Sequence, residues 1–247
     1  MVNIIFRITK FILFLVMAAM LLLSCGNNMN FNNGLNGNRN VVTTNRSVSE
    51  AFETIEAKTG ITVVIEQANE ASIDARTDEN LQEHLKTEIS NGVLSIYFDE
   101  NINDAEERKV FVKVPKVTKI ASSSGASVES TNTIKSENLA LKSSSGSEIN
   151  LSVNSKNLSC DSRSGSKIEA KGKAENLKTE SSSGSSIILE NLETANAICK
   201  ASSGSTTKVS PIESLDADAS SGSSIKYYTN PKKITVDESS GASVSKK

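Results

Sequence analysis

The stretch SSSGSEINLSVNSKNLSCDSRSGSKIEA (143–170) contains two copies of one short pattern, a serine-rich turn around a glycine followed by alternating apolar and polar residues. A third copy, SSSGSSIIL, begins 19 residues after the second, at residue 181. Such recurrence at a fixed period is typical of repeat architectures, in which each unit buries its apolar face against the next. The repeat therefore decides the fold prediction.

The glycine-centred turn recurs seven times, with spacings of 21, 19, 19, 20, 18 and 19 residues. The third residue after each glycine is β-branched, and the residues on either side of it are mostly polar. This period-2 alternation is typical of half-buried strands. A glycine suits a corner that needs a positive φ. The predicted corner glycines are Gly125, Gly146, Gly165, Gly184, Gly204, Gly222 and Gly241.

Each unit therefore reads as strand, Ser-Gly corner, strand and return turn. Identical columns in successive units predict an all-β fold, a parallel β-solenoid with about seven coils of about 19 residues. Coils stack roughly 4.8 Å apart, and parallel crossovers favour a right-handed winding. The predicted solenoid spans 118–247. Residues 46–117, which include the coil-like FETIEAKTGITVVIEQ (52–67), are predicted to form irregular N-terminal β coils that cover one end.

The composition excludes several classes of protein. The chain has 247 residues, of which 37% are hydrophobic and 4% aromatic, and 34 of its 40 serines lie within 121–247. A net charge of −2 provides no basic field for nucleic acid. One histidine and three cysteines leave little for a metal site, so we expect no cofactor and no metal.

The N-terminus has the pattern of a secretory signal. Arg7 and Lys10 precede 13 uncharged residues, too few to span a bilayer, and the run leads into Leu22-Leu23-Ser24-Cys25. This resembles the bacterial lipobox. It implies a signal peptide over 1–24, lipidation of Cys25 and a membrane anchor through the lipid. The Asn/Gly-rich residues after Cys25 predict a flexible tether over 25–45. We expect an outer-membrane location, with the periplasmic face favoured over the cell surface.

Three longer segments carry a family resemblance: RSVSEAFETIEAKTGITVVIEQ (46–67), DENLQEHLKTEISNGVLSIYF (78–98) and KVFVKVPKVTKIASSSGASV (109–128). Together with the SSG repeats, they resemble the auto-transporter adhesin head domain, the GIN domain of Bacteroidetes envelope lipoproteins. The resemblance covers 46–247. It implies a β-helical envelope protein with an adhesin-like role, and it supplies no catalytic motif.

Catalytic chemistry has little support. His84 lies in a charged segment and is expected at the surface. A nucleophilic serine would have to be distinguished from forty, without a nucleophile elbow. Two acidic clusters, Asp216 with Asp218 and Asp104 with Glu106 and Glu107, are expected to be solvated rather than metal-binding. A polysaccharide-processing enzyme would need clustered carboxylates, whereas the predicted outward charges are scattered.

The position two residues before each corner glycine is the candidate binding face, because alternation turns it outward. Serines there could serve the tight corner, or they could present a flat hydroxyl array to a glycan, a wall polymer or a protein. An adhesin-like binding module and a structural or assembly protein of the envelope both remain open, with the oligomeric state undetermined. The candidate residues are Ser123, Ser144, Arg163, Ser182, Ser202, Ser220 and Ser239.

The two cysteines of the repeat test its register. Cys160 and Cys199 each lie five residues before a corner glycine, with Thr179 in the same column between them. They should therefore point inward two coils apart, about 9.6 Å between Cα atoms. A disulfide needs roughly 4.4–6.8 Å. We expect two free, buried thiols even in an oxidising envelope.

Overall fold

The structure is a computed structural model and describes residues 34–247. Residues 35–247 form one compact unit, which consists of eighteen strands and a single short 3-10 turn. The predicted signal peptide (1–24) and the lipidation site Cys25 lie outside the described residues.

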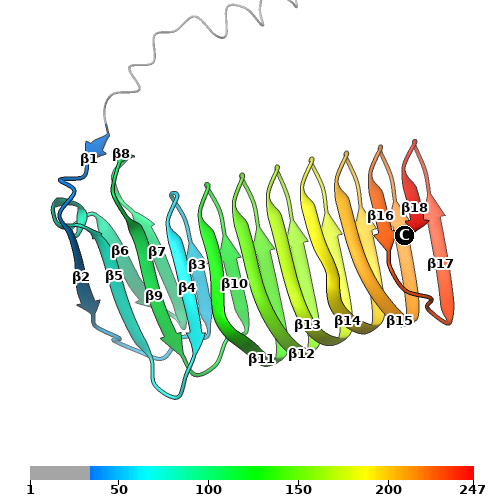
Figure 1. Cartoon of the computed structure of the whole chain (residues 1–247), viewed down its shortest axis with the longest axis horizontal. Coiled ribbons are helices and arrows are strands. Elements are labelled where there is room, and N and C mark those ends of the chain that lie inside the picture. Colours follow the sequence, from blue (N-terminus) through cyan, green and yellow to red (C-terminus); the bar gives the residue numbers. More distant parts are fainter. Residues whose placement is uncertain (1–33) are drawn as a thin grey trace, which may run out of the picture. The chain divides into compact units, whose positions relative to one another are not determined.

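The centre of the unit is a stack of long parallel strands (Figure 1). They are β11 (Ser127–Ser143), β12 (Glu148–Ser162), β13 (Lys167–Ser181), β14 (Ser186–Ala201) and β15 (Thr206–Ala219). The columns seen in the sequence are the actual pairing register, because Val128 pairs with Ile149 and Ile149 with Ile168. The predicted parallel β-solenoid, with about seven turns at a spacing near 19 residues, is confirmed.

The return turn differs from the prediction. Each long strand runs from one corner to the next and bends within its length, with register shifts such as that between Glu169 and Gly172. Gly172 has a φ of +116°, and a Cβ there would clash with the carbonyl oxygen of Val153 in the preceding coil. The bend therefore depends on a close backbone approach that the repeat pattern does not mark.

The corners hold the expected glycines and add a second requirement. All seven corner glycines have φ between +69° and +73°, and the serine before each also has a positive φ, for example +55° at Ser183. The N–H of Ser185 donates back to the carbonyl of Ser182 (3.3 Å). Positive φ at both central residues is the pattern of a type I′ turn. The Gly184 N–H then donates to the Ser203 carbonyl in the next coil (3.0 Å).

The first coil precedes the regular repeat, as its sequence predicts. Strand β3 (Thr54–Ala57) pairs in parallel with β10 (Lys119–Ser122), and β4 (Thr62–Gln67) pairs with β11. Ile55 lies beside Ile120 and Val63 beside Val128, so 52–67 is a true coil with its corner at Gly60.

The rest of the region 46–117, predicted to form irregular β coils, is only partly coil-like. β7 (Val93–Phe98) and β9 (Arg108–Val114) still pair in parallel with the first coil, but β6 (Leu85–Ser90) and β5 (Ser72–Asp78) pair antiparallel to them. The Asn91-Gly92 turn, with positive φ at both residues, reverses the chain between β6 and β7. A 3-10 turn, η1 (Glu79–Leu81), links β5 to β6.

The predicted tether over 25–45 is too long at its C-terminal end. β1 (Leu35–Asn36) pairs with β8 (Ile102–Asp104), and β2 (Val41–Arg46) pairs antiparallel with β5. The buried Asp78 carboxylate accepts hydrogen bonds from the backbone N–H groups of Arg39 and Glu106. These bonds explain why a polar, aperiodic segment is ordered: it is a sheet edge held by a carboxylate from the next strand.

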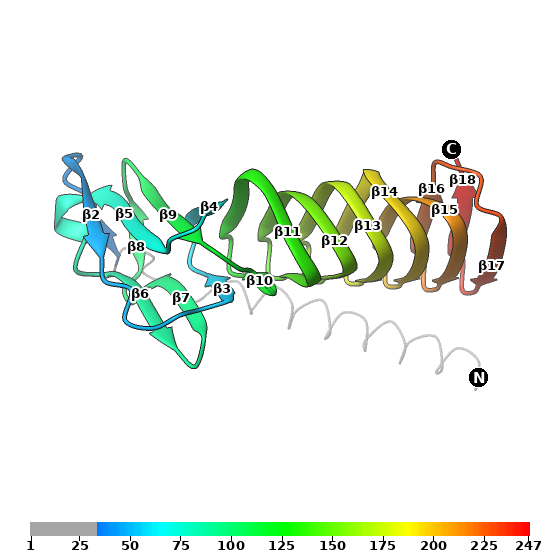
Figure 2. The same cartoon turned by 90° about the horizontal axis from the view of Figure 1, so that it is seen from below.

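The stack ends with β16 (Ser224–Tyr227), which belongs to the coil before the last. The last coil described consists of β17 (Lys233–Glu238) and β18 (Ser243–Lys246), and β18 pairs with β16. It lies at the far end of the stack from β2, β5 and β6 (Figure 2). All six residues of β17 are exposed. The solenoid is therefore covered at one end and open at the other among the residues described.

The cysteine prediction is confirmed. Cys160 pairs in register with Thr179, and Thr179 with Cys199, so the two thiols lie two coils apart. Both are free and buried. Burial raises the pKa of the Cys199 thiol to about 11, and it raises the pKa of the Cys160 thiol further. They behave as small apolar core residues.

Candidate functional site

One outward sheet surface, which we call the ladder face, carries the predicted binding residues. It is the solvent side of β10, of the second halves of β11 to β15, and of β17, and its side chains lie at even positions before the corner glycines. Residues at the odd positions, such as Leu141 and Cys160, point into the core. Because the coils stack in register, each position forms a row that runs along the solenoid.

The predicted Ser row lies where alternation places it. Ser123, Ser144, Ser182, Ser202 and Ser220 are half-buried, while Arg163 and Ser239 are exposed. Within residues 34–247 the hydroxyls of this row accept and donate no hydrogen bonds, so they are turned to solvent.

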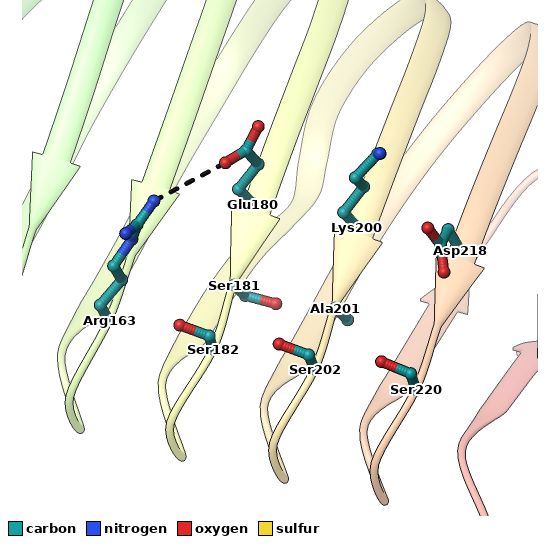
Figure 3. Close-up of a pocket in the computed structure, with 9 residues that line it drawn as sticks. All are labelled: Arg163, Glu180, Ser181, Ser182, Lys200, Ala201, Ser202, Asp218 and Ser220. Carbon is teal, nitrogen blue, oxygen red and sulfur yellow. Dashed lines mark ion pairs between the residues drawn. The ribbon is translucent and has the colours of Figure 1, made fainter. Parts of the chain in front are cut away.

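Part of this row lines an open depression of about 480 Å³ (Figure 3). Arg163, Ser182, Ser202 and Ser220 contribute to it, whereas Ser123, Ser144 and Ser239 do not. The structure therefore brings together four of the seven predicted residues, all in consecutive coils.

Charged side chains of the neighbouring row form the other border of the depression. Glu180, Lys200 and Asp218 occupy the same column in three successive coils. Arg163 approaches Glu180 (3.7 Å), as Figure 3 shows, and pairs more closely with Asp161 (2.7 Å). The pKa of the Glu180 carboxyl is lowered, chiefly because Lys178 donates a hydrogen bond to it. Charges of both signs therefore alternate beside a row of free hydroxyls.

A different serine row supports the corners. The residue after each corner glycine is a buried serine in five coils, and its hydroxyl bonds to the backbone of the preceding coil. Ser166 Oγ donates to the Ser143 carbonyl (2.7 Å), and Ser185 Oγ donates to the Ser162 carbonyl (2.6 Å). The expected role of serine in bonding the next coil thus belongs to this row. Its signal was present in the sequence as a column restricted to serine and alanine.

An asparagine ladder borders the ladder face and was not predicted. Asn157 Nδ2 donates to Asn138 Oδ1 (2.8 Å), Asn176 to Asn157 (3.1 Å) and Asn196 to Asn176 (3.2 Å). Ser214 Oγ closes the row on Asn196 (2.8 Å). The eighth position before the corner glycine is asparagine in four consecutive repeats, and this column was the signal available in the sequence.

A second open depression, of about 410 Å³, lies beside the asparagine ladder. The small side chains of Ala140 and Ser159 contribute to its lining. Ile198 borders it, and 48% of the Ile198 surface is exposed. The ladder face thus combines a charged strip near the corners with a more apolar strip near the asparagines.

The other residues considered for chemistry are dispersed. His84 is half-buried rather than exposed, with Nδ1 3.1 Å from Asp99 Oδ1. Arg39 pairs with Asp104 (2.7 Å) and with Glu106 (3.0 Å).

The acidic pair Asp216 and Asp218 is divided between two rows of the ladder face. Asp216 and Asp218 are exposed in separate columns of the ladder face. Within residues 34–247, no group of three His, Cys, Asp or Glu side chains is placed to hold a metal ion.

Residues 51–231 match the family described as "Putative auto-transporter adhesin, head GIN domain". The chain belongs to this family. The match ends just before β17, so the last GIN-domain coil lies beyond it. No curated protein matches the chain.

Solved structures show the same fold for this GIN-domain chain. A putative adhesin from Bacteroides fragilis has a TM-score of 0.81 at 16% identity, covering 87% of this chain and 100% of its own. A putative lipid binding protein from Parabacteroides distasonis has a TM-score of 0.72 at 18% identity, covering 86% and 99%. A putative adhesin from Parabacteroides merdae has a TM-score of 0.71 at 17% identity, covering 87% and 99%.

The family and its structural neighbours are named as adhesins or binding proteins rather than enzymes. The adhesin family points to an envelope-associated protein. Residues 34–247 contain no helix that is long and apolar enough to cross a bilayer.

Proposed function

We propose that this GIN-domain protein is a non-catalytic, lipid-anchored binding module of the cell envelope, whose ladder face binds an envelope polysaccharide. The observation that carries the proposal is the depression along Arg163, Ser182, Ser202 and Ser220, where solvent-facing hydroxyls lie beside charges of both signs. Membership of an adhesin family supports a binding role.

The chemistry of the face favours a polymer with many hydroxyl groups. Hydroxyls that make no internal hydrogen bond can exchange bonds with water for bonds with a ligand at little cost. Their repetition about every 4.8 Å along the stack suits an extended chain rather than a compact molecule. The ammonium of Lys200, which has no ion pair among residues 34–247, would attract a carboxylate or phosphate group of the polymer. Arg163 would offset the charges of Asp161 and Glu180, with which it pairs.

The same face argues against hydrolysis of such a polymer. A glycosidase needs one carboxyl group with a raised pKa to act as the acid. Glu180 has a lowered pKa because of its hydrogen bond from Lys178, so it stays ionised. Its neighbours in the row are Lys200 and Asp161, and the Asp161 carboxylate is already paired with Arg163 (2.7 Å).

The anchor belongs to the same proposal and rests on the sequence. Cys25 follows a signal-peptide pattern and carries the lipid, with the protein on the periplasmic face of an outer membrane. Cys25→Ala is expected to abolish incorporation of radiolabelled palmitate and to move the protein from the detergent phase to the aqueous phase. Continued partitioning of the variant into detergent would refute the anchor.

Binding is tested with fragment 26–247, which contains the compact unit 35–247. We expect retention on anionic envelope polysaccharide and a loss of at least tenfold in affinity for Arg163→Ala combined with Lys200→Ala. The matched control is Lys208→Ala, which removes an ammonium group from the first half of β15, outside the ladder face, where it pairs with Glu190 (3.2 Å).

An equal loss of affinity in the Lys208→Ala control would indicate nonspecific charge attraction. If immobilised wild-type fragment retains envelope proteins from an extract but no polysaccharide, the polysaccharide assignment is wrong.

A further inference from the structure

The last coil exposes the side chains that the five preceding coils bury. Ile234 is 44% exposed and Val236 is 45% exposed. Their partners in β15, Leu215 and Ala217, are 1% and 0% exposed. Figure 1 places β17 at the end of the stack. An apolar strip of this kind at a sheet edge is a ready template for another strand.

The backbone of β17 offers hydrogen bonds at the same edge. Ser239 donates its N–H to the Ala219 carbonyl in β15 (3.0 Å). In a parallel strand the direction of the backbone groups alternates, so Thr235 also bonds toward β15. The N–H and C=O groups of Ile234 and Val236 consequently face away from the stack. β17 has no strand on that side among residues 34–247.

The sequence of β17, KITVDE (233–238), is complementary to itself in one antiparallel register. Opposed residues in an antiparallel pair point to the same face, so a two-fold axis between identical strands must centre on a residue. With the axis on Thr235, Ile234 opposes the partner's Val236 on the core side. Lys233 then opposes the partner's Asp237 on the solvent side.

The neighbouring registers lack this match. An axis on Val236 would set Ile234 against the partner's Glu238, and an axis on Ile234 would set Val236 against the partner's Lys232. Opposite charges and paired apolar side chains stabilise directly opposed positions, whereas a charge facing an apolar group does not. The axis on Thr235 also lets Ile234 and the partner's Val236 exchange both of their free backbone bonds.

We propose that two copies of this protein join end to end through antiparallel pairing of their β17 strands. The opposite end of the solenoid cannot take part in the same way, because Leu81 and Leu85 are buried beneath the antiparallel strands there. The contact is therefore isologous and closes as a dimer instead of continuing as a filament. This inference does not depend on the proposed ligand.

The charge match gives the first test, by sedimentation velocity of fragment 26–247 over a range of concentrations. We expect a reversible dimer, weakened at least tenfold by Lys233→Glu and likewise by Asp237→Lys, because each places like charges opposite one another. The double variant carrying both changes restores the attraction and should restore the dimer. A monomer at all concentrations, or a dimer indifferent to all three variants, overturns the proposal.

A cysteine at the axis tests the register itself. Thr235 opposes its own copy as a non-hydrogen-bonded pair, where Cα atoms lie about 4.5 Å apart, within reach of a disulfide. Thr235→Cys should therefore form a cross-linked dimer under a mild oxidant. Asp216→Cys is the control, since Asp216 occupies the same column one coil inside the edge. Equal cross-linking of both variants, or none at Thr235→Cys, refutes this register.

Discussion

The two ends of the solenoid differ in how far their apolar side chains are covered. At the N-terminal end the parallel stack passes into antiparallel strands, and β5, β6 and the turn η1 bury Leu81 and Leu85. At the C-terminal end the parallel pattern continues to β18 and leaves Ile234 and Val236 about half exposed. Between them the coils repeat with nearly constant register.

The contrast shows that every coil of a repeat is covered by neighbouring coils on both sides, except for the coils at its two ends. Each inner coil is buried by its neighbours, so identical columns suffice to stabilise it. An end coil needs something that the repeat lacks. The N-terminal end uses strands of reversed direction for this purpose, and the C-terminal end leaves the surface available for a partner. Five predictions test this contrast and the coils between the two ends.

Truncating an apolar side chain should give the largest difference in the free energy of unfolding between the two ends. Leu81→Ala removes a fully buried side chain from the covered end and should cost about 2–5 kcal/mol of the free energy of unfolding. Ile234→Ala, in the exposed last coil, should cost less than about 1 kcal/mol under monomeric conditions. Urea denaturation of fragment 26–247 measures both. Equal costs would show that Ile234 is covered in solution.

Alkaline pH tests the thiols buried between the ends. The folded-state pKa of Cys199 is raised from 9.0 to about 11. Its thiol therefore contributes full stability below about pH 9, and that contribution is lost as the pH rises toward 11. The loss is on the order of 2 to 3 kcal/mol, since one pKa unit corresponds to about 1.4 kcal/mol. Cys160→Ala/Cys199→Ala should lose less stability over this range than the wild type.

The same thiols report on fraying of the open end. Cys199 has two coils beyond it on that side and Cys160 has four. Because solenoids open from an uncovered end, a thiol reagent should label Cys199 before Cys160, and both slowly. Mass spectrometry at timed intervals gives the order of labelling. Faster labelling of Cys160 would contradict an opening that starts at β17.

Corner glycines should matter less at the open end. Gly60 and Gly241 have φ of +68° and +72°, where an alanine is strained by about 1–2 kcal/mol. Gly60→Ala should show this full cost in urea denaturation, while Gly241→Ala should show a few tenths of a kcal/mol, because the last coil can open locally. Asparagine tolerates positive φ, so Gly60→Asn is the control and should recover part of the loss.

The smallest effect is expected along the asparagine ladder, which stops before the last coil. Asn157 bonds to asparagines on both sides, whereas Ser214 closes the row with one bond. Asn157→Ala should cost about 1 kcal/mol and Ser214→Ala less, since one exposed hydrogen bond contributes little net stability. Thermal melting compares the two. A larger effect at Ser214 would mean that the ladder is anchored at its open end.

The candidate site was predictable only in part. Alternation from the corner glycines placed the Ser row on the outside, and the structure finds those residues at the surface. Which of them share a depression is decided by the side chains around them, which include Arg163, Glu180 and Lys200. The asparagine ladder and the buried row containing Ser166 were visible as columns, but a column does not say which hydrogen bonds its members make.

The sequence by itself determined the stacked coils, their register, the corner positions and the free state of Cys160 and Cys199. It could do so because every coil meets a near-copy of itself, so local periodicity and tertiary packing carry the same information. Only the tertiary structure decided the covered end, the strand made by Val41–Arg46, the bend at Gly172 and the open edge of β17. Those features join segments without a common repeat, and such contacts follow from three-dimensional packing rather than from a local pattern.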